Sequence, residues 1–285
     1  MSLSDPFFTK TLSSVGRAIK NCLSDNNHAR AAFVDIVQQR PMSMLSAETL
    51  KAIYLLSGEC DRAIVEIGAY VGGATVTILH ATQKRKNVFI TIEEPVEHPS
   101  HPEIPTRNTI DDLNANIRAF GLVRENHYLI SGASFETWVL GSLHHRLLGN
   151  PVGLLVWDAD TCIDRDLILF SPYLGEACLL VIDDYVSREV KSARITLVVD
   201  DLVRRGIIEP IAYLPWATWF GRLRRKPTPT EIGEYRAEWG RLAASDHPYY
   251  QRLVDYEARL RDGAPAPLTF EERMDFWRRA SAWGG

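Results

Sequence analysis

The stretch VEIGAYVGGATVTILHA (residues 65–81) joins the end of an apolar strand, a glycine turn and the start of a helix. A strand that passes through such a turn into a helix is the beginning of a βαβ unit. The glycine spacing over residues 68–73 is G-x-x-x-G-G, which differs from the G-x-G-x-x-G of a dinucleotide pyrophosphate loop. Glu66, two residues before the first glycine, disfavours a phosphate and suits a ligand with cationic or hydroxyl groups. A simple tight connection between strand and helix remains the structural alternative.

Composition and charge set limits on the kind of protein. The chain has 285 residues, of which 46% are hydrophobic and 24% charged, with a formal net charge of −4. That length suits one large domain or two small ones, and the charge provides no basic field for nucleic acid. The sequence shows neither a secretory signal nor an apolar run long enough to span a bilayer. The 4 cysteines have no metal or disulfide spacing, so we expect a cytoplasmic protein with reduced thiols.

The pattern after residue 62 predicts a doubly wound α/β fold. Short, wholly apolar runs alternate with amphipathic stretches, which is typical of parallel strands covered by helices on both faces. We expect a mostly parallel, seven-stranded, Rossmann-like sheet that ends in an antiparallel hairpin at 207–214 and 218–224. The five preceding strands are predicted at 63–68, 88–93, 127–132, 153–158 and 178–183, and the helices between and after them at 73–84, 107–120, 135–148, 163–173 and 187–205.

The two ends of the chain are predicted to be helical. We expect residues 1–60 to form an N-terminal cap, residues 61–226 the core and residues 227–285 a C-terminal extension. The expected helices are 5–25, 28–39 and 46–58 at one end, and 230–243, 247–261 and 269–281 at the other. Ser46 and Thr228 stand where helices begin. The helical additions are expected to select the ligand, and they are candidates for a homo-oligomer interface.

Ligands of open α/β sheets bind outside the carboxyl ends of the strands, so the residues there are informative. Glu93 ends the second predicted strand, where a carboxylate commonly holds both ribose hydroxyls; a helix cap or a solvent-facing side chain is the alternative. Gly132-Ala-Ser134 follows the third strand, and its small residues leave room for a flat base. Ser134 alternatively caps the next helix.

Three carboxylates follow the fourth and fifth predicted strands. Asp158 ends the run Gly153–Asp158, and Asp183 and Asp184 end the next. If these strands are neighbours, the three acids converge and repel one another, and a hard divalent cation removes that cost. Ligands that are all oxygen suit Mg²⁺, although aspartates at strand ends can also simply cap loops.

Taken together, these motifs resemble class I S-adenosylmethionine (SAM) dependent methyltransferases, and in particular the catechol-type O-methyltransferases. The family pattern E-x-G-A-Y-x-G, T-I-E and G-A-S is similar to Glu66–Gly72, Thr91–Glu93 and Gly132–Ser134, within a match over about residues 60–225. The resemblance implies that SAM binds with Glu93 at the ribose and Ser134 near the adenine. The residues implied at the methionine end of SAM are Glu66, Gly68, Ala69 and Gly72. It also implies Mg²⁺ at Asp158, Asp183 and Asp184, with Asp158 adjoining the cofactor as well.

One departure from the catechol pattern changes the expected acceptor. Thr161 stands where catechol enzymes have a lysine, whereas Asp158-x-Asp160 and the later Asp183-Asp-Tyr185 resemble natural-product tailoring O-methyltransferases. We therefore expect methyl transfer to a hydroxyl of a sugar-like or polyhydroxylated small molecule, with Asp160 as general base. The alternatives are a dinucleotide-binding oxidoreductase, which binding of NAD(H) rather than SAM would reveal, and a non-catalytic protein of the same fold that acts as a partner.

Overall fold

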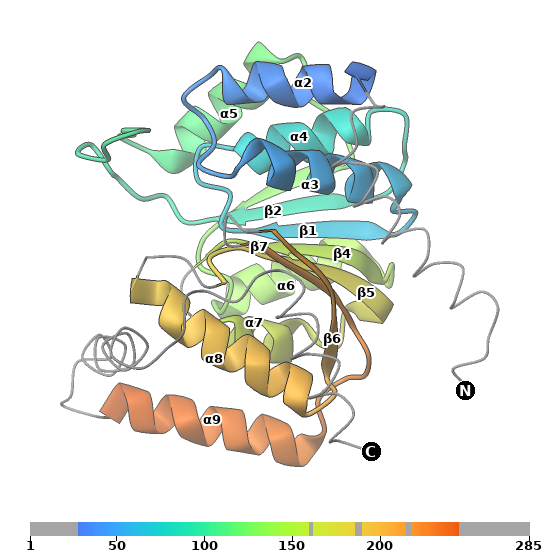
Figure 1. Cartoon of the computed structure of the whole chain (residues 1–285), viewed down its shortest axis with the longest axis vertical. Helices are drawn as coiled ribbons and strands as arrows, with labels where there is room; N and C mark the ends of the chain where they lie inside the picture. The colour runs from blue at the N-terminus through green and yellow to red at the C-terminus, as the bar shows by residue number, and fades with distance from the viewer. Residues whose placement is uncertain (1–27, 160–161, 186–189, 215–217, 245–285) are drawn as a thin grey trace. The chain divides into compact units, whose positions relative to one another are not determined.

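Seven strands of the described residues form one sheet in the order β3-β2-β1-β4-β5-β7-β6 (Figure 1). The computed structural model describes residues 28–159, 162–185, 190–214 and 218–244. Strand β2 pairs in parallel with β1 and with β3, whereas β7 pairs antiparallel with β5 and with β6. This confirms the predicted Rossmann-like sheet with its terminal hairpin. The strands are β1 (Ala63–Ile67), β2 (Phe89–Glu93), β3 (His127–Ser131), β4 (Val152–Trp157), β5 (Leu174–Ile182), β6 (Ile208–Leu214) and β7 (Thr218–Leu223).

Helices alternate with the strands as predicted. They are α2 (His28–Gln38), α3 (Ala47–Glu59), α4 (Gly73–Ala81), α5 (Thr109–Ala119), α6 (Thr137–Leu147), α7 (Ile163–Phe170), α8 (Val190–Arg204) and α9 (Pro229–Ala244). Strand β5 differs from the prediction because it begins at Leu174 and not at Cys178. Its first residues include Gly175 and an exposed Glu176, and Ala177 has a φ of 56°, so this part lacks the sequence pattern of a buried strand.

The chain divides into two compact units, Met1–Val156 and Trp157–Gly285. In the first unit β1 and β2 are buried along their whole length, which explains why most of their residues are apolar and makes the buried Glu66, Thr91 and Glu93 exceptional. Figure 1 shows α2, α3 and α4 on one side of these strands and α6 on the other. Helices therefore cover both faces of β1 and β2, so we expect a ligand to bind at the ends of the strands.

The turn into α4 is packed tightly against the segment that precedes α3. Ser46 caps α3 as predicted, because its hydroxyl accepts a hydrogen bond from the Thr49 N–H at 3.1 Å. A Cβ atom at Gly73 would lie 2.4 Å from the Ser43 Cβ and 2.6 Å from the Met42 carbonyl oxygen. Glycine at the first position of α4 is thus required by this close approach, whatever ligand the turn binds.

In the second unit α7 contacts both α8 and α9, and β7 lies between β5 and β6. The predicted capping box at the start of α9 is present: the Glu231 carboxylate accepts from the Thr228 N–H at 2.7 Å, and the Thr228 hydroxyl accepts from the Glu231 N–H at 3.3 Å. Arg225 extends this contact by donating from both terminal nitrogens to the two Glu231 oxygens, at 2.7 and 2.6 Å. The start of α9 is therefore fixed to the end of β7.

Several expectations concern parts of the chain outside the described residues. These are the helices expected at 5–25, 247–261 and 269–281, whereas those expected at 28–39, 46–58 and 230–243 are present as α2, α3 and α9. The oligomer interface stays a prediction. The division at residues 60 and 226 stays a prediction. Across the described part of the chain, no helix combines the length and the apolar character needed to cross a membrane.

Candidate functional site

The glycine turn after β1 is built from left-handed backbone conformations. Gly68 has a φ of 79°, Tyr70 of 52° and Gly72 of 97°. The turn is closed by a hydrogen bond from the Gly72 N–H to the Ala69 carbonyl at 2.9 Å, and the Gly68 N–H donates to Ile92 in β2 at 3.0 Å. Glycine is thus needed at 68 and 72 because larger residues adopt this conformation at a cost. The three positive φ angles bend the backbone sharply at the carboxyl end of β1.

Glu66 is the most deeply buried acid near this turn, with 1% of its surface exposed. Its Oε2 atom accepts hydrogen bonds from the Thr75 hydroxyl at 2.6 Å and the Thr91 hydroxyl at 3.1 Å. Within the described residues, Oε1 is buried and has no hydrogen-bond partner. Burial raises the Glu66 pKa to about 7, although the two hydroxyls oppose this and Glu93 adds to it. An unpartnered buried carboxylate oxygen needs a donor, and a cationic ligand group would supply one.

Glu93 ends β2 and connects that strand to the glycine turn. Its Oε2 atom accepts a hydrogen bond from the Tyr70 N–H at 2.9 Å, and the side chain is 7% exposed. Burial raises its pKa to about 7, while the backbone N–H groups of Tyr70 and Ala69 lower it. Glu93 is therefore neither a helix cap nor a solvent-facing side chain, and it retains acceptor capacity for a ligand hydroxyl.

The segment after β3 has the small residues that the sequence led us to expect. Gly132 has a φ of 151° and donates its N–H to the Glu93 carbonyl at 2.8 Å, which continues the pairing with β2. Ser134 is 5% exposed. The reading of Ser134 as a helix cap is wrong, because α6 begins after Glu136, whose carboxylate turns back to accept from the Ala133 N–H at 2.9 Å.

The three predicted metal ligands lie together in the second unit. Asp158, Asp183 and Asp184 each offer an oxygen, and these atoms lie within 4.8 Å of one another. The Asp183 N–H donates to the Trp157 carbonyl at 3.0 Å. This hydrogen bond holds the backbone of Asp183 beside the residue that precedes Asp158. Asp184 has a φ of 57° and is 8% exposed. Three carboxylates held this close are a suitable oxygen ligand set for a hard divalent cation.

Thr218, at the start of β7, holds one member of this cluster. Its hydroxyl donates to Asp183 Oδ1 at 2.6 Å, and Thr218 itself is fully buried. The bond occupies one lone pair of the carboxylate and fixes the rotation of its plane. Such support of a ligating carboxylate is typical of metal sites.

The sequence did not identify Thr75, His127 or Thr218 as residues that support the site. It also indicated one site residue that the structure does not describe. Asp160, the predicted general base, lies outside the described residues. Thr75 could have been found from its position two residues into α4, facing the strand from which the turn comes. His127 and Thr218 carry no motif, and pairing them with an acid requires the strand register, which sequence alone does not supply.

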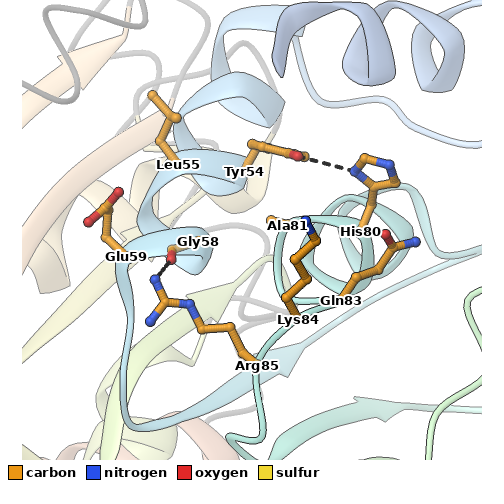
Figure 2. Close-up of a pocket in the computed structure, with 9 residues that line it drawn as sticks. All are labelled: Tyr54, Leu55, Gly58, Glu59, His80, Ala81, Gln83, Lys84 and Arg85. Atoms are coloured by element: carbon orange, nitrogen blue, oxygen red, sulfur yellow. Dashed lines mark hydrogen bonds between the residues drawn. The ribbon is translucent and has the colours of Figure 1, made fainter. Parts of the chain in front are cut away.

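A surface pocket in the first unit lies away from all of these residues. Figure 2 shows that it is formed by the last turns of α3 and α4 and by the loop that follows α4. The Tyr54 hydroxyl and His80 Nδ1 are 3.2 Å apart there, and Arg85 donates to the Gly58 carbonyl at the end of α3. Because α3 leads into the start of β1, the pocket lies beside the amino end of that strand, and it is not the ligand site expected for this fold.

Comparison with solved structures places the chain among proteins with a methyltransferase fold. The SAH-bound methyltransferase PaMTH1 from Podospora anserina matches with a TM-score of 0.51 and 15% identity, over 80% of this chain and 100% of that one. The O-methyltransferase TomG from Streptomyces achromogenes, solved with SAM, gives 0.50 and 15%, over 71% and 91%. Cofactor-bound Rv0187 from MTB gives 0.50 and 18%, over 70% and 89%. At these identities the likeness establishes the fold.

No protein-family profile matches the chain, and no curated protein matches it either.

Proposed function

We propose that this chain is a SAM-dependent and Mg²⁺-dependent O-methyltransferase that acts on a small hydroxylated molecule. The observation that carries the proposal is the cluster of Asp158, Asp183 and Asp184, whose oxygens lie within 4.8 Å of one another. The same fold occurs in proteins with many different functions, so the fold alone does not identify the reaction. The three carboxylates indicate a particular property, the binding of a divalent cation. The similar structures of PaMTH1 and TomG, solved with SAH and SAM, support the choice of cofactor.

The residues of the first unit fit SAM in charge and in shape. The cofactor carries an ammonium group at its amino-acid end, and the buried Oε1 atom of Glu66 lacks a donor among the described residues. Glu93 is assigned to the ribose hydroxyls and Ser134 to the adenine side. Gly68, Ala69 and Gly72 themselves have no long side chain, and the hydroxyl of Tyr70 in the same bend donates to the Ile104 carbonyl at 2.5 Å.

The residues of the second unit fit Mg²⁺ because all of their donors are carboxylate oxygens. When bound, the ion would act as a Lewis acid that lowers the pKa of an acceptor hydroxyl and fixes its orientation. Asp158, Asp183 and Asp184 would hold it, and Asp158 is also assigned to the cofactor. Thr218 would keep the Asp183 carboxylate in one orientation.

Asp160 is proposed as the general base that removes the acceptor proton. It stands two residues after Asp158 in the sequence, and the lysine of catechol enzymes is replaced by Thr161. Asp160→Asn keeps the size of the side chain and cannot take a proton, so we expect kcat to fall by roughly 10²–10⁴. The loss should shrink at high pH, where the hydroxyl ionises without help. A variant with wild-type kcat at neutral pH, at saturating SAM and Mg²⁺, would remove Asp160 from the reaction.

The proposed acceptor is a sugar-like or polyhydroxylated molecule that offers two neighbouring oxygens. The support is the pair of motifs Asp158-x-Asp160 and Asp183-Asp-Tyr185. The direct experiment is to incubate the protein with SAM, Mg²⁺ and a panel of nucleotide sugars, glycosides and catechols, and to detect SAH. Turnover of catechols alone would overturn the choice of acceptor, and SAM that stays intact with every hydroxylated compound would count against the methyltransferase itself.

Cofactor binding is tested separately with Glu93. Removing a hydrogen bond to a charged group costs about 1.5–3 kcal/mol, so Glu93→Ala should weaken SAM binding by that amount in calorimetry. Glu94→Ala is the matched control, because Glu94 is the next carboxylate and is exposed. Glu93→Gln keeps an acceptor for the Tyr70 N–H and separates loss of the ligand contact from disturbance of the turn. Binding of NAD(H) in place of SAM by the folded wild type would identify a dinucleotide enzyme.

A further inference from the structure

The strands of the first unit contain a chain of hydrogen bonds that reaches Glu66 from the far side of β2. Thr91 lies directly opposite Glu66 in the β1–β2 register, and its hydroxyl is 3.1 Å from Glu66 Oε2. The same hydroxyl is 3.1 Å from Nε2 of His127, the first residue of β3. Thr91 is fully buried and therefore bridges the two side chains without competition from water.

The proton count shows which group donates and which accepts in each of these hydrogen bonds. The Thr91 hydroxyl has one proton, and when it is donated to the Glu66 carboxylate the Thr91 oxygen must accept from His127. The histidine must then carry its proton on Nε2, an assignment that comes from the network itself. Burial lowers the His127 pKa to about 4, and the charge of Arg124 adds to this, so the ring is neutral at neutral pH. A neutral ring has one N–H, and the network places it toward Thr91.

We propose that His127 is a positioning residue that orients the Glu66 carboxylate, through the Thr91 hydroxyl, to receive the ammonium group of SAM. With Thr75 and Thr91 both donating to Oε2, the plane of the carboxylate is fixed and Oε1 is left as the acceptor for the ligand. The inference rests on the proposed function, since it names the cofactor group that Oε1 receives. It assigns a role to a histidine that stands in no recognised motif.

The packing around His127 allows the hydrogen bond to be removed without removing the ring. His127 stacks on Phe89, with ring centroids 4.9 Å apart and an interplanar angle of 28°. His127→Phe keeps an aromatic ring on Phe89 and loses the donor. His127→Gln places an amide nitrogen the same number of bonds from the backbone as Nε2, so it can again donate to Thr91.

Two charged side chains shift the pKa values of the residues at the two ends of this hydrogen-bond network. Glu93 raises the pKa of Glu66, and Arg124 lowers that of His127. Measurements at pH 8 keep Glu66 and Glu93 mainly ionised, since both have a pKa of about 7. At that pH a change in SAM affinity reports the geometry of the carboxylate and not its protonation.

The experiment measures the dissociation constant of SAM by calorimetry at pH 8 for wild type and variants. A hydrogen bond between neutral groups contributes about 0.5–1.5 kcal/mol, so His127→Phe should weaken binding by about three- to tenfold. His127→Gln should restore affinity to within about twofold of wild type. In a Glu66→Ala background, His127→Phe should have no further effect, because the side chain that it orients is gone.

A second measurement needs no cofactor. A ¹³C titration of the glutamate carboxyls in the ligand-free protein should show the Glu66 pKa rising when His127→Phe removes support for the charged form, and returning with His127→Gln. Thermal unfolding confirms that each variant is folded at the temperature used.

The outcomes separate the inference from the proposed function. If wild type does not bind SAM, the proposed function fails and the inference fails with it. If wild type binds SAM but His127→Phe changes neither the affinity nor the Glu66 pKa, the inference alone is overturned. It is also overturned if His127→Phe weakens SAM binding equally in the Glu66→Ala background, since the effect would then come from packing.

Discussion

At the scale of single residues, burial makes the ionised form of two glutamates unfavourable, and a bound ligand would offset this. Glu66 and Glu93 both have a pKa raised to about 7, mainly by burial. A carboxylate whose pKa is raised on folding is stabilising in its protonated form and destabilising in its ionised form. Burial therefore favours the protonated form of both groups in the ligand-free protein. A cationic or hydroxyl-bearing ligand would favour the ionised form of each.

The pH dependence of stability tests this account of Glu66. Its pKa rises from 4.5 to about 7 on folding, so its contribution to the free energy of unfolding should fall as pH rises through that interval. Between pH 5 and pH 8, wild type should lose about 2–3 kcal/mol relative to Glu66→Gln, measured by urea unfolding without ligand. His127, with a pKa of about 4, acts in the opposite direction between about pH 4 and 6.5, so the difference between the two proteins is the relevant quantity. Parallel curves would show that Glu66 ionises normally.

At the scale of secondary structure elements, the sequence predicted those with strong local patterns and failed where tertiary packing decides. The N-cap at Ser46 and the capping box at Thr228 are local features, and both helix starts were predicted correctly. The first four residues of β5 were missed because Gly175 and Glu176 have weak strand propensity. Those residues form a strand because β5 lies between the neighbouring strands β4 and β7. The periodicity of the sequence does not reveal that pairing.

The start of α9 gives a prediction at this scale. Thr228→Ala removes the hydroxyl that accepts from the Glu231 N–H, and loss of an N-cap costs about 1 kcal/mol. The expected result is a lower midpoint of thermal unfolding, followed by circular dichroism. Thr230→Ala is the control, because this exposed threonine lies two residues further along the same helix. Equal midpoints for Thr228→Ala and wild type would mean that the contact between Arg225 and Glu231 fixes the helix start alone.

At the scale of the whole molecule, the sequence predicted candidate ligand residues but not the side chains that support them. Residues at the ends of strands predicted the cluster of Asp158, Asp183 and Asp184, which the structure confirms, whereas the ligand roles of Glu66 and Glu93 stay predictions. The supporting side chains His127 and Thr218 come from other strands of the sheet. Their partners depend on strand register, which is set by packing across the sheet and carries no local signal.

The two predicted ligand sets belong to different compact units, and this leads to a prediction about their independence. Glu66, Glu93 and Ser134 lie in Met1–Val156, whereas Asp158, Asp183 and Asp184 lie in Trp157–Gly285. Only Asp158 is assigned to both ligands, so most of the contacts proposed for SAM do not involve the ion. Chelation with EDTA should therefore abolish methyl transfer and leave the SAM dissociation constant within about threefold of its value in Mg²⁺. The Asp183→Asn/Asp184→Asn double variant should behave in the same way, and it should also lose binding of Mn²⁺ followed by electron paramagnetic resonance.

Glu176→Gln is the matched control for this last experiment, since it removes an exposed carboxylate from the same strand, β5, that leads into the metal cluster. It should keep both Mn²⁺ binding and methyl transfer. Full methyl transfer in EDTA would show that the three acids only cap loops, because catalysis would then proceed without the ion that they are proposed to hold. Loss of SAM binding together with the metal would contradict independence instead. Asp158 would be the first residue to examine in that case, because it is the one assigned to both ligands.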